Sequence, residues 1–268
     1  MIRTPLTYHR PDSTPAAAWL LGEHREDASV LAGGTMLVPL MSRGQRVVRH
    51  LIDLAAAGVD GIRAADGMVH IGARATYSKI ATSQDIEREL PVLARVAAGI
   101  TGGAQVRNVG TLGGSACYAN PSSDGPGVLV ALGARMVVLG PAGERRVDAA
   151  SFFTGAFRTA LAADELLVAI EIPAGQPRCG YHKLKLCTGS WPIVTATATV
   201  AAEGWRAVTL GGVCETPLRV ELDPVESADT QLQARIRQPW SDELADGEYR
   251  RAVAGAIARR ALAEIEGG

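Results

Sequence analysis

Two pairs of adjacent glycines, far apart in the chain, constrain its fold more than any other feature. The first lies in AGGTM, residues 32–36, and the second lies in QVRNVGTLGGS, residues 105–115. Glycine allows backbone N–H groups to converge on a bulky anion with no Cβ in the way. The hydroxyls of Thr35, Thr111 and Ser115 are donors for phosphate oxygens. Either pair alone would predict only a tight turn, but together they predict a site that holds a diphosphate from both sides.

The phosphate-binding motifs of the common nucleotide folds do not occur in the sequence. No GxGxxG opens a helix after the first predicted strand, and there is no GxxxxGK[ST]. A dinucleotide would therefore not be held here in the Rossmann manner. No GxSxG or other recognisable nucleophile–base arrangement occurs either. We predict no catalytic acid, base or nucleophile.

Hydrophobic periodicity predicts a mixture of helices and strands. Helices are expected at 14–24, with Thr14 as cap, just after residue 36, from residue 78, at 89–100, after the glycine-rich segment, and from Ser241 onward. Strands are expected at 28–32, 50–54, 68–76 and 164–174, with hairpin turns at 140–143 and 203–204. Residues 221–240 have weak periodicity and are expected to be a long connection.

The pattern of the sequence changes at residues 175–178, GQPR. In the segment that follows, which includes PIVTATATV, side chains alternate with a period of two residues. We therefore predict one domain at 1–175, divided into subdomains at about 1–55 and 56–175, and a second at 176–268. With 47% apolar and 21% charged residues the chain is typical of a soluble globular protein. A net charge of −1 gives no reason to expect nucleic acid or an anionic membrane as a partner. No apolar run could span a bilayer, and no signal core is visible, so a cytoplasmic location is expected.

Cysteine and histidine spacing gives no sign of a metal centre. The four cysteines are scattered without a CxxC pair, which argues against a disulfide framework, a zinc site or an iron–sulfur cluster. The five histidines form no HExxH motif. We predict no metal site, and we expect Cys117, close to the second glycine pair, to be a small buried thiol.

Several segments resemble one known family in the expected order over nearly the whole chain. They are LAGGTMLVPLM, HLIDL, IGARAT, VRNVGTLGGSACYANPSSDGPGVLVALGA, GAFRTALAADELLVAIEIP and YHKLKLCTGSWPIVTATATV. These segments are similar to the FAD-binding medium subunit of molybdenum hydroxylases, a family that includes the carbon monoxide dehydrogenase flavoprotein and the flavin domain of xanthine dehydrogenase. The resemblance implies an α+β, vanillyl-alcohol-oxidase-type FAD fold of two subdomains, followed by a C-terminal domain with a small antiparallel sheet and helices.

The same resemblance implies which residues bind FAD. The diphosphate would be held by Ala32, Gly33, Gly34, Thr35 and Met36 together with Thr111, Gly113, Gly114 and Ser115. Asp124 would lie on the adenosine side, where a carboxylate can accept from ribose hydroxyls. Leu167 would lie against the flavin ring, Lys183 near it, and Trp191 would shield it. Without the resemblance, Asp124 would be a turn residue and Leu167 a core residue. Lys183 would be a solvated lysine at a strand edge, and Trp191 would cap the sheet.

We expect non-covalent FAD and an oxidoreductase that is one subunit of a larger dehydrogenase. An iron–sulfur subunit and a molybdopterin subunit would be its partners, and FAD would pass their electrons to a terminal acceptor. The alternative is a stand-alone, homo-oligomeric flavoenzyme that oxidises a small molecule in a biosynthetic pathway. A scaffold that binds no flavin is a third possibility. Two departures from the family pattern favour the stand-alone flavoenzyme. Ser115 stands where the family usually has asparagine, and the region after Arg219 is expected to be short and irregular.

Overall fold

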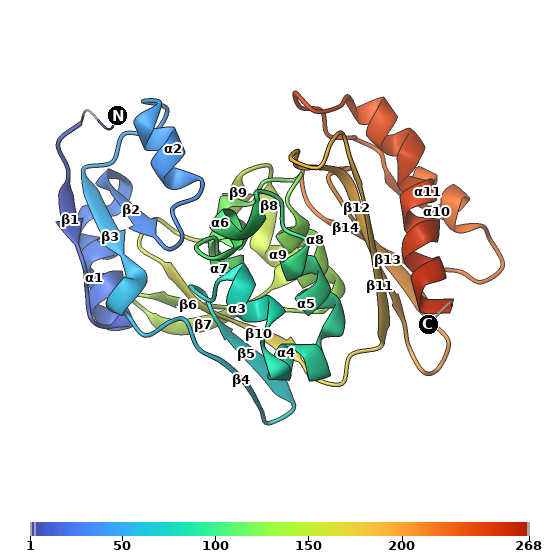
Figure 1. Ribbon diagram of the computed structural model, residues 1–268, viewed down its shortest axis with the longest axis horizontal. Helices are drawn as coiled ribbons and strands as arrows, with labels where there is room; N and C mark the ends of the chain where they lie inside the picture. The colour runs from blue at the N-terminus through green and yellow to red at the C-terminus, as the bar shows by residue number, and fades with distance from the viewer. Residues whose placement is uncertain (1, 3, 267–268) are drawn as a thin grey trace.

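The computed structural model describes residue 2 and residues 4–266. The three largest sheets follow one another along the chain: a small N-terminal sheet, a central five-stranded sheet and a C-terminal four-stranded sheet (Figure 1). Helices pack on the faces of each sheet, and strands of the two larger sheets are antiparallel throughout. This arrangement is an α+β fold, as the sequence predicted.

The N-terminal sheet is parallel, in the order β1 (Thr7–His9), β3 (His50–Asp53) and β2 (Ala28–Leu31). Helix α1 (Thr14–His24) covers one face and α2 (Leu37–Ser42) the other, because neighbouring side chains of β3 alternate: Ile52 packs with α1 and Leu51 with α2. The predicted bounds of α1 are confirmed, but Ser13 rather than Thr14 occupies the cap position. Short 3-10 turns, η1 (Arg25–Asp27) and η2 (Leu54–Ala56), join these elements.

The central sheet has the order β4 (Ile62–Ala65), β5 (Met68–Gly72), β10 (Leu166–Pro173), β6 (Arg135–Gly140) and β7 (Gly143–Asp148). One face packs against α3 (Tyr77–Ala81), α4 (Gln84–Glu89), α5 (Pro91–Ala98) and α8 (Asp124–Ala131). Small elements follow β7, namely α9 (Ala149–Phe152), β8 (Phe153–Gly155) and β9 (Arg158–Thr159). The predicted hairpin at 140–143 is confirmed by the pairing of β6 with β7.

The glycine-rich segment folds largely as helix, which the sequence did not predict. It contains α6 (Gly103–Arg107) and α7 (Leu112–Tyr118). Thr111 caps α7, since its Oγ1 accepts from the backbone N–H of Gly114 at 3.0 Å. The second glycine pair therefore lies in the first turn of a helix and not in an open loop.

The C-terminal sheet runs β11 (Arg178–Lys185), β12 (Pro192–Val200), β13 (Arg206–Gly211) and β14 (Leu218–Leu222). Helices α10 (Ala228–Arg235) and α11 (Gly247–Glu266) lie on one side, and α8 lies on the other. The alternation in β12 does not mark a solvent face: Ala196 packs in the core beneath α11, and Thr195 is also buried, beside Gly127 of α8. The hairpin turn predicted at 203–204 is confirmed.

Two predictions for the C-terminal region are wrong. Residues 221–240 are not a plain connection, because α10 lies within them, and the last helix starts at Gly247 instead of Ser241. The region after Arg219 is therefore regular. The helix α10 has few apolar residues, which is why its periodicity was weak. Separate core clusters lie largely on either side of residue 176, where the domain boundary stays a prediction.

One buried arginine ties the C-terminal helix to several distant segments. Arg250 of α11 is fully buried and donates to the Ser122 hydroxyl at 3.3 Å and to the Gly212 carbonyl at 2.9 Å. It also donates to the Ile193 carbonyl and forms an ion pair with Asp242. Such a buried cation is tolerated only because its N–H groups are paired. Among the described residues no helix is both long and apolar enough to cross a membrane.

Candidate functional site

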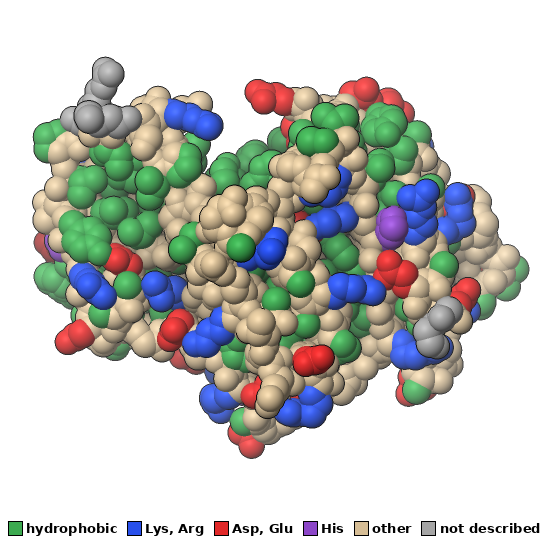
Figure 2. Space-filling model, viewed as in Figure 1, with side chains coloured by type: hydrophobic (Ala, Val, Ile, Leu, Met, Phe, Trp, Pro, Cys, Tyr) green, Lys and Arg blue, Asp and Glu red, His purple; other side chains and the backbone are tan. Residues whose placement is uncertain are grey.

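A cleft of about 1050 Å³ contains nearly all of the predicted site. It lies between the N-terminal sheet and the rest of the molecule, where the surface is hollowed (Figure 2). The lining includes Ala32, Gly33, Gly34, Thr35, Met36, Thr111, Gly113, Gly114, Ser115, Asp124, Leu167 and Trp191. Lys183 is not part of the lining, but it contacts Asp124 from behind the wall. Segments separated by most of the chain are thus brought to one cavity.

The two glycine segments touch each other. A Cβ on Gly33 would lie 2.0 Å from the carbonyl oxygen of Val109, in the turn that leads to Thr111. Gly34 has a φ of +69°, which is the left-handed region that side chains other than glycine rarely adopt. Residues 32–36 and 111–115 therefore form one continuous wall, as a site holding a diphosphate from two segments requires.

The glycines of the second segment are needed first for contacts within the protein. A Cβ on Gly113 would lie 2.4 Å from the carbonyl oxygen of Ala73, and one on Gly114 would lie 2.7 Å from Thr111 Oγ1. The sequence argument attributed these glycines to the approach of an anion alone. The structure adds a different cause, because α7 packs backbone against backbone on the segment after β5.

Hydroxyls in the wall are themselves held in place. Ser115 Oγ accepts from the hydroxyl of the buried Tyr77 at 2.5 Å. Burial raises the pKa of Tyr77 above its ordinary value, so the phenol stays protonated and remains a donor. Thr111 Oγ1 accepts from Gly114 N–H, which leaves the Thr111 O–H as a donor. Ser115 therefore presents a hydroxyl that Tyr77 holds in a fixed position, although the family usually has asparagine here.

A buried carboxylate joins the cleft wall to the C-terminal sheet. Asp124, 2% exposed, accepts through Oδ1 from Lys183 Nζ at 2.6 Å and from the hydroxyl of Tyr181. Lys183 also donates to the carbonyl of Gly99 at 2.8 Å. Burial, and after it the charge of Asp124, raises the pKa of Tyr181 well above its ordinary value, so this phenol also remains a donor.

This contact brings together two residues that the sequence assigned to different parts of FAD. The resemblance implied that Asp124 lies on the adenosine side and Lys183 near the flavin ring. Since Lys183 Nζ is 2.6 Å from Asp124 Oδ1, the two side chains lie at the same end of the cleft. Which part of the cofactor lies at this end of the cleft stays a prediction.

Several residues of the cleft were missed by sequence reasoning. Arg46 and Tyr118 line it, and so does Phe157 from the segment after β8. Cys117 also lines it and is exposed, so the expectation of a buried thiol is wrong. Cys117 and Ser115 belong to the same short helix, α7, which the sequence analysis did not recognise as a helix. Nothing in the sequence marks Arg46, because it follows α2 in an irregular segment.

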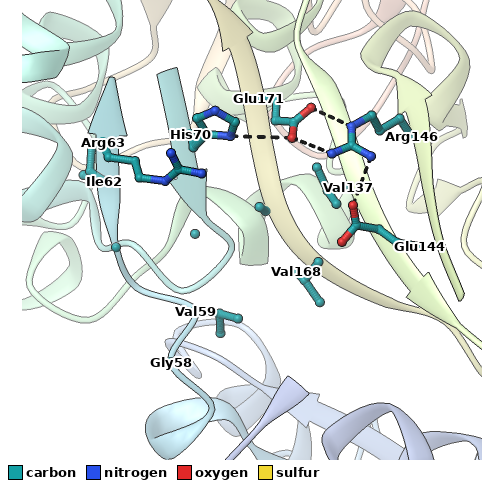
Figure 3. A pocket seen from close by; sticks show the side chains of 13 residues that line it. Gly58, Val59, Ile62, Arg63, His70, Val137, Glu144, Arg146, Val168 and Glu171 are labelled. Atoms are coloured by element: carbon teal, nitrogen blue, oxygen red, sulfur yellow. Dashed lines mark hydrogen bonds and ion pairs between the residues drawn. The ribbon is translucent and has the colours of Figure 1, made fainter. Parts of the chain in front are cut away.

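A second hollow, of about 420 Å³, lies on the other face of the central sheet and contains none of the predicted residues (Figure 3). Four of its side chains are linked by ion pairs. Arg146 contacts Glu171 at 2.9 Å and Glu144 at 3.0 Å, and His70 Nδ1 lies 3.5 Å from Glu171. This is a network of surface ion pairs, with most of its charge already compensated.

Comparison with known proteins agrees with the geometry. Residues 4–175 match the model of the FAD binding domain in molybdopterin dehydrogenase. The carbon monoxide dehydrogenase medium chain of Afipia carboxidovorans is 35% identical over 280 residues, covering 98% of this chain and 97% of the relative.

Solved structures agree over the full length. The carbon monoxide dehydrogenase from Hydrogenophaga pseudoflava superposes with a TM-score of 0.92 at 33% identity, covering 100% of this chain and 99% of the other. Quinoline 2-oxidoreductase from Pseudomonas putida 86 superposes with a TM-score of 0.90 at 27% identity, with the same coverage. The predicted fold, the FAD cofactor and the oxidoreductase class are confirmed. This chain belongs to the family of FAD-binding subunits of the molybdenum hydroxylases.

Proposed function

We propose that this chain is the flavin subunit of a multi-subunit molybdenum-containing dehydrogenase. It would receive electrons from an iron–sulfur subunit, which takes them from a molybdopterin subunit that oxidises the substrate, and pass them to a terminal acceptor. The observation that carries the proposal is the single cleft formed by both glycine segments in a chain that matches a medium chain over 97% of its length. The cytoplasmic location stays a prediction.

The residues of the cleft fit FAD in their chemistry. We propose that residues 32–36 and 111–115 hold the diphosphate, where Thr111 O–H is a donor and Arg46 adds positive charge. Leu167 and Trp191 offer apolar and flat surfaces for the isoalloxazine ring. The bound cofactor supplies the redox chemistry, and these side chains bind and orient it.

We assign the ion pair of Asp124 and Lys183 to the flavin end of the cleft. Trp191 immediately precedes β12, the strand that pairs with β11, which carries Lys183. The Asp124 carboxylate fixes the Lys183 ammonium, so the cation is held at a constant position beside the ring-binding surface.

FAD is expected to be non-covalent. Cys117 is the one cysteine of the chain that lines the cleft, and no histidine of the described residues does. Acid precipitation should release the yellow chromophore into the supernatant. Colour that stays in the pellet of wild type and disappears from the pellet of Cys117→Ser would contradict the proposal.

Electron transfer distinguishes the subunit from the stand-alone enzyme. We expect the tagged chain to copurify with an iron–sulfur and a molybdenum-containing subunit when it is produced from its own host. Reduced iron–sulfur subunit, added without oxygen, should bleach the flavin absorbance of this chain. If the chain alone is homo-oligomeric and is reduced by a small-molecule substrate with no partner present, the stand-alone alternative is right instead.

A further inference from the structure

Three histidines that are far apart in sequence meet at the N-terminal sheet, and none of them lines the FAD cleft. They are His9 on β1, His24 at the end of α1 and His50 on β3. Each is half-buried, and one ring nitrogen from each lies within 4.8 Å of the others. Of the described residues, this is the single group of three or more histidine, cysteine or acidic side chains placed to hold a metal ion.

The topology of the sheet brings these side chains together. In the parallel pairing of β1 with β3, His9 is opposite Ile52, and His50 precedes Ile52 by two residues. Side chains two apart on a strand, and side chains directly paired across strands, share a face. His9 and His50 thus lie on the face that packs against α1, and His24 is the last residue of that helix.

The spacing suits a tetrahedral ion. His9 Nε2 lies 3.0 Å from His50 Nδ1, whereas two nitrogens bound to one tetrahedral zinc ion are about 3.3 Å apart, from Zn–N bonds of about 2.0–2.1 Å. His24 and His50 are stacked with ring centroids 3.6 Å apart and planes 12° apart. The His24 ring must rotate out of this stack to direct its nitrogen at the same ion.

The charged groups and the helix end around the three histidines favour binding of a cation. An arginine is adjacent in sequence to each histidine: Arg10, Arg25 and Arg49. Two of them are paired elsewhere, Arg25 with Asp164 at 3.5 Å and Arg49 with Asp27 at 3.3 Å. His24 ends an eleven-residue helix, whose terminal carbonyls attract positive charge.

We propose that His9, His24 and His50 form a binding site for a divalent transition-metal ion of the Zn²⁺ class, with water as the fourth ligand. Three imidazoles and an open position are a donor set that Zn²⁺ accepts. On binding, the ring that donates the hydrogen bond between His9 and His50 gives up that proton to water and takes one up from water on its other nitrogen, so each imidazole stays neutral with one N–H and one nitrogen free for the ion. The ion would fasten β1, an edge strand of three residues, to β3 and to the end of α1.

The test uses the full FAD-loaded chain, titrated with Zn²⁺ against a chromophoric chelator, with Co²⁺ as a spectroscopic probe. We expect one equivalent of Zn²⁺, a visible absorption band typical of tetrahedral Co²⁺ and a higher melting temperature with Zn²⁺. His24→Gln and His50→Gln should each weaken Zn²⁺ binding by at least about tenfold. His182→Gln, a histidine of β11 near Glu264, is the matched control and should bind like wild type.

Each result decides the proposal. His24 ends a helix at a half-buried position, so His24→Gln should keep its FAD and its zinc-free melting temperature, and its loss of metal then reports the site alone. Absence of saturable Zn²⁺ binding by the wild-type chain would overturn the proposal. Equal binding by wild type and His24→Gln, or loss of binding in His182→Gln, would overturn it as well. FAD content is measured separately, so failure here leaves the proposed function standing.

Discussion

Replacing Gly113 with alanine tests why the second glycine pair exists. The added Cβ would lie 2.4 Å from the carbonyl oxygen of Ala73, whereas ordinary contact begins at 3.4 Å. Helix α7 and the segment after β5 must therefore separate by about 1 Å, the difference between these distances. Overpacking of this kind costs about 1–3 kcal/mol. At roughly 2–4 °C per kcal/mol, the melting temperature of the FAD-free chain should fall by about 2–12 °C.

The assay compares thermal unfolding of FAD-free protein with FAD affinity measured by flavin fluorescence. Gly189→Ala is the matched control, because Gly189 also lines the cleft and a Cβ there would meet no atom within 4 Å. We expect the control to melt like wild type and to bind FAD normally. If FAD-free Gly113→Ala melts like wild type and only FAD affinity falls, the contact with Ala73 is not the reason for the glycine. The anion-approach argument would then be sufficient.

Three further experiments test other parts of the structure. Arg250→Met should cost about 3–5 kcal/mol in urea unfolding, since it leaves Asp242 without its buried cation. Arg206→Met, at an exposed pair with Glu266, should cost no more than about 1 kcal/mol, and equal costs would refute the argument. FAD should protect Cys117 from a maleimide, as measured by mass spectrometry, while the exposed Cys187 outside the cleft lining should label equally with and without FAD. Trp191→Ala should brighten the fluorescence of bound flavin, because a stacked indole quenches it. An unchanged yield with a lower melting temperature would remove Trp191 from the flavin site.

Elements with strong local signals were predictable from the sequence. Residues 14–24 have proline near the start of an apolar helix, and the hairpin turns at 140–143 and 203–204 contain glycine, so each was found at or close to its observed position. The errors have physical causes. Glycine has low helix propensity, yet α7 forms because Thr111 caps it and because its glycines allow close packing on Ala73.

The composition of the cleft was predictable, but its internal geometry was not. Both glycine segments, Leu167 and Trp191 do line one cavity. The contact between Asp124 and Lys183 depends on how β11 docks against α8, which no local pattern encodes. The histidine cluster depends likewise on a parallel strand register, so widely spaced histidines gave no motif to recognise.

The docking of the C-terminal sheet has a consequence for biogenesis. The partners of Asp124, which are Tyr181 and Lys183, leave the ribosome after the N-terminal half of the cleft, and so does Trp191. Arg250, which links α11 to Ser122, follows close to the end of synthesis. Domains generally fold as they emerge, N-terminal part first. A nascent chain therefore carries a cleft that lacks Gly189 and Trp191, and its Asp124 carboxylate gains its partners only when β11 has been made.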